Sequence, residues 1–105
     1  MSAGRRVWIP KKLTERVTVP FDFVSDLQPS ETILSATVTA SVYSGTDPAY
    51  ASIVAGSPTT DGTKVYINVQ GGVVGTTYGL LCHATTSAGQ LLDMTMYCVV
   101  QTNLP

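Results

Sequence analysis

Residues 76–100, TTYGLLCHATTSAGQLLDMTMYCVV, contain the clearest pattern in the chain, two runs of alternating apolar side chains joined by a short polar segment. Apolar residues recur at every second position in residues 78–84 and again in residues 92–100. A period of two places these side chains on one face of a β-strand. Ser87, Ala88 and Gly89 are typical turn residues. The stretch therefore predicts two antiparallel strands joined as a hairpin.

Shorter alternating runs precede this hairpin. The expected strands cover residues 17–24, 31–43, 51–55 and 64–69, with a loop rich in Gly, Ser, Pro and Thr over residues 56–62. Pro20 cannot donate a ladder hydrogen bond, so it confines the first of these strands to a sheet edge or a bulge. About seven short strands separated by turns predict an all-β, immunoglobulin-like β-sandwich, with a small closed barrel as the alternative.

The composition agrees with a single folded β domain. The chain has 105 residues, of which 12% are charged and 44% hydrophobic. Charged residues make up roughly 25% of an average soluble domain, so long solvated helices are not expected. The apolar content is sufficient for a core, and the length suits one domain.

The charges divide the chain into two parts. Residues 1–16 hold five basic residues and one acidic residue, whereas residues 17–105 hold one basic and six acidic residues. We therefore expect an extended basic N-terminal arm over residues 1–16 and the sandwich over residues 17–105. Pro10 restricts the preceding residue to extended conformations, which favours a strand-like segment over a helix.

The arm contains the residues that we expect to bind a partner. Trp8, the single tryptophan of the chain, lies among cations. Tryptophan is enriched at interface anchors, because its large apolar surface is buried there. The alternative is a solvated terminus that carries a few charges. The predicted partner-binding residues are Arg5, Arg6, Trp8, Ile9, Lys11 and Lys12.

The sequence shows no signal peptide and no apolar run long enough to span a membrane, so we expect no export and no membrane partner. Cys82 and Cys98 lie on the apolar faces of neighbouring strands. They could form a disulfide in an oxidising compartment, but two buried thiols in a reducing cytoplasm are favoured. The pairing stays open at this point.

No catalytic, metal or cofactor site is predicted. His83, Ser87 and Asp93 provide a base, a nucleophile and an acid, but nothing around Ser87 indicates a strained elbow or an oxyanion hole. One histidine and two cysteines on separate strands do not have the spacing of a zinc site. The glycines of residues 71–75 lack the setting of a phosphate-binding loop. The acidic body disfavours nucleic acid as a partner.

Three segments resemble a known family. They are ETILSA at residues 31–36, GGVVGTTY at residues 71–78 and CHATTSAGQ at residues 82–90. They resemble a small group of immunoglobulin-like phage virion proteins described as fibre-tail adaptors, and the resemblance spans roughly residues 11–100. The arm sequence RRVWIP at residues 5–10 departs from the family pattern.

The resemblance implies a structural virion protein of the tail or connector region, assembled in the bacterial cytoplasm. Its expected partners are the connector, a tail fibre and copies of itself, with no small-molecule substrate and no enzymatic activity. Two alternatives remain. One is a capsid decoration protein that cements neighbouring capsid subunits. The other is a carbohydrate-binding adhesion module in which Tyr43, Tyr50, Tyr66 and Tyr97 stack against sugars, although packing at strand ends is the favoured role of these tyrosines.

Overall fold

The computed structural model describes residues 8–101. These residues form seven strands and two short 3₁₀ helices. In chain order the elements are β1 (Trp8–Lys12), β2 (Val17–Asp22), η1 (Val24–Asp26), β3 (Ile33–Ser44), η2 (Tyr50–Ile53), β4 (Val54–Asp61), β5 (Lys64–Val69), β6 (Thr77–Thr86) and β7 (Leu91–Gln101). No helix in this part of the chain is long and apolar enough to cross a membrane.

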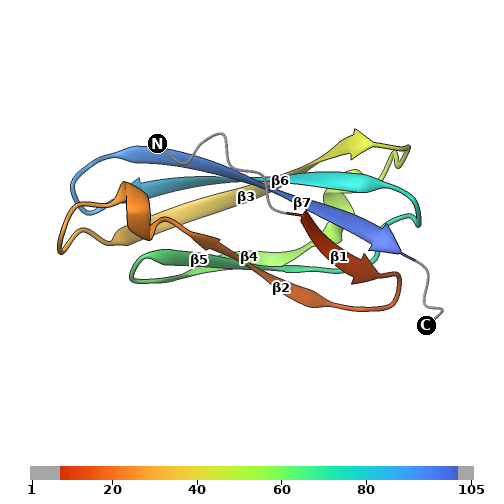
Figure 1. Ribbon diagram of the computed structural model, residues 1–105, viewed down its shortest axis with the longest axis horizontal. Coiled ribbons are helices and arrows are strands. Elements are labelled where there is room, and N and C mark those ends of the chain that lie inside the picture. The colour runs from red at the N-terminus through yellow and green to blue at the C-terminus, as the bar shows by residue number, and fades with distance from the viewer. Residues whose placement is uncertain (1–7, 102–105) are drawn as a thin grey trace.

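The strands form two sheets packed face to face (Figure 1). One sheet has four strands in the order β1-β7-β6-β3, and the other has three in the order β2-β5-β4. The orders β7-β6-β3 and β2-β5-β4 correspond to the two sheets of an immunoglobulin domain. The predicted all-β sandwich of about seven strands is therefore confirmed, and the barrel alternative is wrong.

Alternation along each strand builds the core between the sheets. Val65, Ile67 and Val69 of β5 are buried, while the residues between them are half exposed. The predicted hairpin behaves in the same way, with Leu80 and Cys82 of β6 facing the core. The core cluster comprises Val19, Phe21, Phe23, Ile33, Ile53, Val65, Ile67, Val69, Tyr78, Leu80, Cys82, Ala84, Met94, Met96, Cys98 and Val100.

Pro20 lies in β2, which is an edge strand of the three-stranded sheet, as predicted. The region after β3 differs from the prediction. Residues 51–55 were expected to be a strand, but most of them form the 3₁₀ helix η2. The loop expected over residues 56–62 is largely the strand β4, whose register with β5 shifts between Ala55 and Thr59. This irregularity accommodates Gly56 and Pro58 on an edge strand, where proline is tolerated.

The two cysteines are free and buried. Across the β6–β7 ladder Cys82 lies opposite Met94, whereas Cys98 lies opposite Tyr78. Four residues along a strand correspond to about 14 Å, far beyond the ~4.4–6.8 Å between the Cα atoms of a disulfide. The question that the sequence left open is thus answered by the register, because these two thiols cannot pair within one chain.

Candidate protein-interaction site

The predicted arm enters the sandwich as an edge strand. Residues Trp8–Lys12 form β1, which pairs in parallel with the C-terminal half of β7. Trp8 lies opposite Tyr97, and Ile9 lies opposite Cys98. Pro10 is exposed and lies at the outer edge of this sheet, where its missing N–H costs no ladder bond. The extended conformation predicted for this segment is confirmed, and Arg5 and Arg6 lie outside the described residues.

Lys11 has a role within the fold. Its side chain is completely buried. The ammonium donates hydrogen bonds to the carbonyl oxygens of Lys12 at 2.8 Å, Leu13 at 3.0 Å and Gly71 at 2.8 Å. Burial lowers the pKa of this ammonium, with a smaller opposing effect from nearby Cys98 and Glu15. Lys11 therefore ties the end of β1 to the loop between β5 and β6, and its charged group is not available to a partner.

Lys12, in contrast, is exposed. Its backbone N–H donates to Glu15 Oε1 at 2.7 Å, and the N–H of Glu15 donates back to the Lys12 carbonyl at 3.0 Å. This reciprocal pair ends β1 in a tight turn before β2. Among the predicted cations, Lys12 is thus placed where it can meet a partner, at the surface beside the edge strand.

The outer face of the four-stranded sheet carries few charges. Its central rows run from β3 through β6 to β7 and consist mainly of hydroxyl and apolar side chains. Tyr43 and Tyr97 meet edge to face on it, with ring centroids 4.7 Å apart. The Tyr97 ring lies beside Gly79, where a Cβ atom would come within 3.8 Å of it. The residues on the outward side of the three strands are Ser35, Thr37, Thr39, Ser41, Tyr43, Thr77, Gly79, Leu81, His83, Thr85, Leu91, Asp93, Thr95, Tyr97 and Val99.

The four tyrosines of the adhesion alternative do not form one platform. Tyr43 and Tyr97 lie on the four-stranded sheet, whereas Tyr66 belongs to β5 of the other sheet and lies opposite Pro20. Tyr50 belongs to η2. A sugar that stacked on Tyr43 could therefore not reach Tyr66.

His83 and Asp93 face each other on the exposed side of β6 and β7, where His83 Nδ1 contacts Asp93 Oδ1. Ser87 does not complete a triad with them. Its hydroxyl accepts a hydrogen bond from the Thr32 N–H at 3.0 Å, which ties the β6–β7 hairpin to the segment before β3. Within residues 8–101, no three His, Cys, Asp or Glu side chains gather where they could hold a metal ion.

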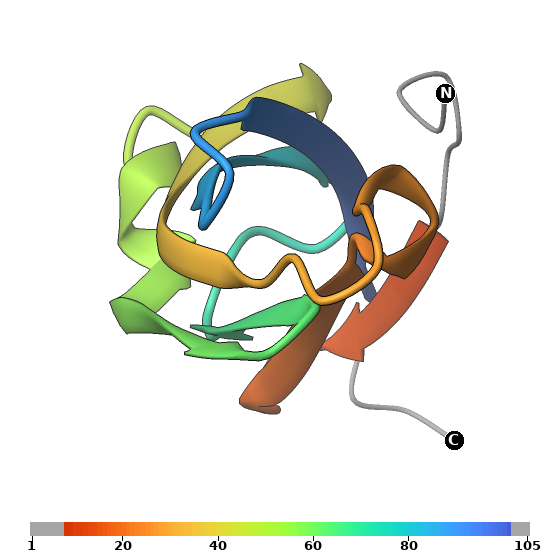
Figure 2. The same ribbon diagram turned by 90° about the vertical axis from the view of Figure 1, so that its left-hand side faces the viewer.

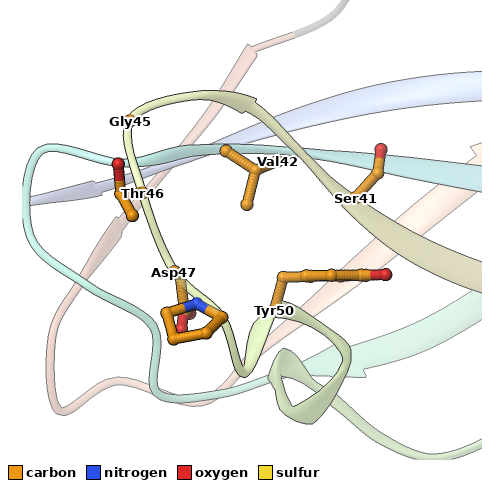
Figure 3. Close-up of a pocket in the computed structure, with 7 residues that line it drawn as sticks. Ser41, Val42, Gly45, Thr46, Asp47 and Tyr50 are labelled. Carbon is orange, nitrogen blue, oxygen red and sulfur yellow. The ribbon is translucent and has the colours of Figure 1, made fainter.

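A hollow lies between the end of β3 and the segment of residues 45–50 that follows it. It has a volume of about 540 Å³, and Ser41, Val42, Asp47, Pro48 and Tyr50 are among the residues that line it. Figure 3 shows the Tyr50 side chain extended below Ser41 and Val42, with the loop of Gly45, Thr46 and Asp47 at one end. A second hollow of about 420 Å³ adjoins Tyr50 and is lined by Val38, Ala40, Ala51 and Val54. Tyr50 lines both hollows, and residues of β3 border each of them.

The chain, a small two-sheet sandwich whose N-terminal segment forms an edge strand, also matches a known protein family. Residues 11–99 match the family model described as podophage GP4 fiber-tail adaptor protein gp77. The chain belongs to this family. The fibre-tail adaptor resemblance seen in the sequence is thereby confirmed, and membership indicates a structural protein of the phage virion. No curated protein matches the chain at a significant level.

Sequence reasoning did not show that β3 is the last strand of the four-stranded sheet or that β4 and η2 lie beside it. A signal was present, because residues 33–44 contain no charged residue, no proline and no glycine. Its meaning depends on which strands lie at the sheet edges, and alternation alone does not show the strand order.

Proposed function

We propose that this chain joins the phage tail connector to tail fibres through protein–protein contacts, with copies of itself as additional partners. Its membership of the fibre-tail adaptor family is the observation that carries the proposal. The structure supplies a suitable body, since a sandwich with an almost uncharged outer face can pack against another protein surface without burying unpaired charges.

In this proposal the arm, residues 1–16, anchors the body, residues 17–105, to its neighbours. Residues 8–12 of the arm are fixed to the body, because β1 pairs with β7 and the buried Lys11 ammonium donates hydrogen bonds to three carbonyl oxygens. The arm also carries the positive charges of Arg5, Arg6 and Lys12, whereas residues 17–105 have a net negative charge. Opposite charges on arm and body favour association between the arm of one copy and the body of the next.

A truncation that spares the fold tests this role of the arm. Deletion of residues 1–7 leaves β1 and Lys11 intact, whereas a longer deletion would remove part of the four-stranded sheet. We expect the truncated chain to fold and to be absent from purified particles. The double variant Arg5→Glu/Arg6→Glu should also be lost from particles, while Arg5→Lys/Arg6→Lys should be retained because it keeps both charges. Normal incorporation of the truncated chain would overturn the anchoring role.

Copy number separates the adaptor from the capsid-decoration alternative. An adaptor at the tail occupies one vertex of the particle, whereas a cement protein covers the shell and is present in far more copies. Quantitative protein analysis of purified virions, with the major capsid protein as internal standard, distinguishes the two. Stoichiometry close to that of the capsid protein would exclude the adaptor function proposed here.

A further inference from the structure

The two ends of the sandwich carry different charges. The strands run roughly along the longest axis of the molecule, which extends over 44 Å, so the connecting segments gather at two ends (Figure 1). The basic end contains the β1–β2 turn, residues 13–16, the β5–β6 loop, residues 70–76, and the segment after β3, residues 45–49. The acidic end contains residues 23–32, the β4–β5 turn, residues 62–63, and the β6–β7 turn, residues 87–90.

The basic end is organised around the buried Lys11. The Lys11 ammonium donates hydrogen bonds to the carbonyl oxygens of Leu13 at 3.0 Å and Gly71 at 2.8 Å, which holds the β1–β2 turn next to the β5–β6 loop. Three large apolar side chains are exposed on these two segments, those of Leu13, Val73 and Val74. The basic end therefore presents an apolar surface built from two adjoining segments.

Cations outnumber carboxylates at the basic end. Lys12 and Arg16 are both exposed there. The carboxylates of Glu15 and Asp47 lie at the same end, but they already accept hydrogen bonds from within the chain, Glu15 from the Lys12 N–H and Asp47 from the Tyr78 hydroxyl and the N–H of residue 49. Two exposed cations thus border the apolar surface.

The acidic end has the opposite charge. Its segments are tied together, because the Ile33 N–H donates to the Gly62 carbonyl at 2.7 Å and the Ser87 N–H donates to the Thr32 carbonyl at 2.8 Å. The charged residues that the structure describes at this end are Asp22, Asp26, Glu31, Asp61 and Lys64. Glu31 is buried, whereas Asp22 and Asp61 are exposed. Carboxylates therefore dominate its surface.

Exposed apolar side chains accompany these carboxylates. Val24, Leu34 and Leu91 are 57%, 63% and 80% exposed. Figure 2 views the molecule from this end, with η1 in orange and the β6–β7 hairpin in blue. A single exposed apolar residue is ordinary on a protein surface, but a group of them bordered by polar residues marks an interaction site. Each end of the sandwich carries such a group, and the two groups are bordered by opposite charges.

We propose that the basic end of one copy binds the acidic end of the next copy. This inference rests on the proposed function, because it names the surface of a second copy that residues 12–16 of the arm contact. Burial of the apolar groups supplies affinity, and the opposite charges set the orientation. The molecule measures 26 × 25 Å across its longest axis. A contact of that cross-section matches the roughly 600 Å² per partner at the lower limit of stable interfaces.

The contact joins unlike surfaces, head to tail. Each copy has one basic and one acidic end, so a copy bound at one end keeps the other end for a further copy. Contacts of this type continue into an open filament or close into a ring. Self-association should therefore proceed beyond a dimer, and salt should weaken it because exposed charges are screened.

Exchange of the charges tests the pairing of the two ends. In analytical ultracentrifugation of the full chain, Lys12→Glu/Arg16→Glu and Asp22→Lys/Asp61→Lys should each weaken self-association by at least tenfold. An equimolar mixture of the two variants should associate again, because every contact then joins opposite charges. Lys64→Glu, a charge reversal at the acidic end, is the control and should not weaken association. Circular dichroism verifies that each variant folds. A monomeric wild type, or a mixture no more associated than its components, would overturn the proposal.

Crosslinking tests the orientation without changing any charge. One full-length chain carries Val74→Cys at the basic end, and the other carries Leu91→Cys at the acidic end. Both native thiols are buried, so the new cysteines dominate oxidation. We expect the mixed disulfide to exceed either homodimer by at least tenfold, and to exceed by the same factor the product with Thr39→Cys on the exposed face of β3. Equal yields of all these products contradict a head-to-tail contact.

The failure of this inference differs from the failure of the proposed function. If deletion of residues 1–7 removes the chain from particles but the charge exchange has no effect on self-association, the arm binds another virion protein and the adaptor function stands. If the two ends pair as expected but the copy number in virions equals that of the capsid protein, the contact between copies is real and the adaptor function fails.

Discussion

The Tyr78 hydroxyl donates a hydrogen bond to Asp47 Oδ2 at 2.7 Å, which joins the start of β6 to the loop after β3. The same hydroxyl accepts a hydrogen bond from the Val73 N–H at 2.7 Å. This is the arrangement of a tyrosine corner, in which a tyrosine near the start of the sixth strand bonds to backbone just upstream. Because Asp47 also lines the hollow at the end of β3, these hydrogen bonds hold one side of that hollow in place.

Tyr78→Phe should therefore destabilise the domain. The ring would stay in the core, but Asp47 Oδ2 and the Val73 N–H would each lose a partner in a partly buried site. Loss of such a partner costs about 1–3 kcal/mol. Urea unfolding measures this change in the free energy of unfolding. Tyr50→Phe at an exposed position is the matched control and should change stability by less than about 0.5 kcal/mol. Equal effects of the two variants would contradict the structural role of the Tyr78 hydroxyl.

Lys11→Ala should destabilise the domain far more than Lys12→Ala. Lys11 is fully buried and its ammonium serves three carbonyl oxygens, whereas the neighbouring Lys12 side chain is exposed. Loss of the buried methylenes and of these charge-assisted hydrogen bonds should cost about 2–4 kcal/mol. Lys12→Ala should fall within about 0.5 kcal/mol of the wild type.

Hydrogen exchange locates the effect of Lys11. In the Lys11→Ala chain the amides of β1 should lose protection before those of β5 and β6, because β1 is held by one neighbouring strand and this side chain. A Lys11 that acted only as a surface contact for a partner would leave both the stability and the β1 protection unchanged.

Alternation of apolar and polar residues predicts the strands of this chain only where one face of the strand is buried. Where one face of a strand is buried, as in β5 or β6, apolar residues at every second position locate the strand and its inward side chains. Pro20 also predicted that β2 lies at a sheet edge, because proline cannot donate a hydrogen bond to a ladder. The two-sheet fold followed from the number and length of these strands.

Lys11 and the region after β3 could not be predicted in this way. A lysine next to another lysine in a basic segment indicates a solvated charge, and its burial depends on carbonyl oxygens that include Gly71, sixty positions further along the chain. Likewise, Gly56 and Pro58 indicate a loop, and their place in β4 depends on a register shift against β5. Both features arise from contacts between distant segments, which local pattern does not contain.

Gly72→Ala should be more destabilising than Gly71→Ala. Both glycines have positive φ, 97° for Gly72 and 64° for Gly71, so each alanine incurs backbone strain of about 1–2 kcal/mol. A Cβ at Gly72 would also lie 2.8 Å from Val100 Cγ2 and 3.2 Å from the Tyr78 ring, whereas a Cβ at Gly71 meets nothing within 4 Å. Thermal or urea unfolding of the pair separates the clash from the strain, and equal losses would show that the loop relaxes away from Val100.

The thiols of Cys82 and Cys98 should be unreactive in the folded protein. Both side chains are buried, and burial raises the pKa of Cys82 to about 12 and also raises that of Cys98. The reactive species is the thiolate, so both low access and low ionisation slow the reaction. Ellman's reagent at pH 8 should detect neither thiol in the native chain and both in guanidinium chloride. Rapid labelling of the native chain would indicate that β6 and β7 open readily.

Stability should fall as the pH rises through the alkaline range. Burial raises the pKa of Cys82 from 9.0 to about 12 and that of Tyr78 from 10.0 to about 12, so the folded chain holds both protons where the unfolded chain releases them. The stability from these groups is fully present below about pH 9 and is lost progressively towards pH 12. Lys11 acts in the opposite direction, because its lowered pKa makes the folded state relatively more stable as the pH approaches 10.5.

Cys82→Ala isolates the largest of these contributions. Each group whose protonation differs between the folded and unfolded states changes the free energy of unfolding by up to about 1.4 kcal/mol per pH unit. The variant should therefore be less stable than the wild type at pH 7, because it loses packed volume, but its stability should decline less steeply between pH 9 and pH 11. Urea midpoints measured at half-unit pH steps give both slopes. Parallel curves for the two chains would mean that Cys82 ionises in the folded state as readily as in the unfolded chain, which its burial in the core forbids.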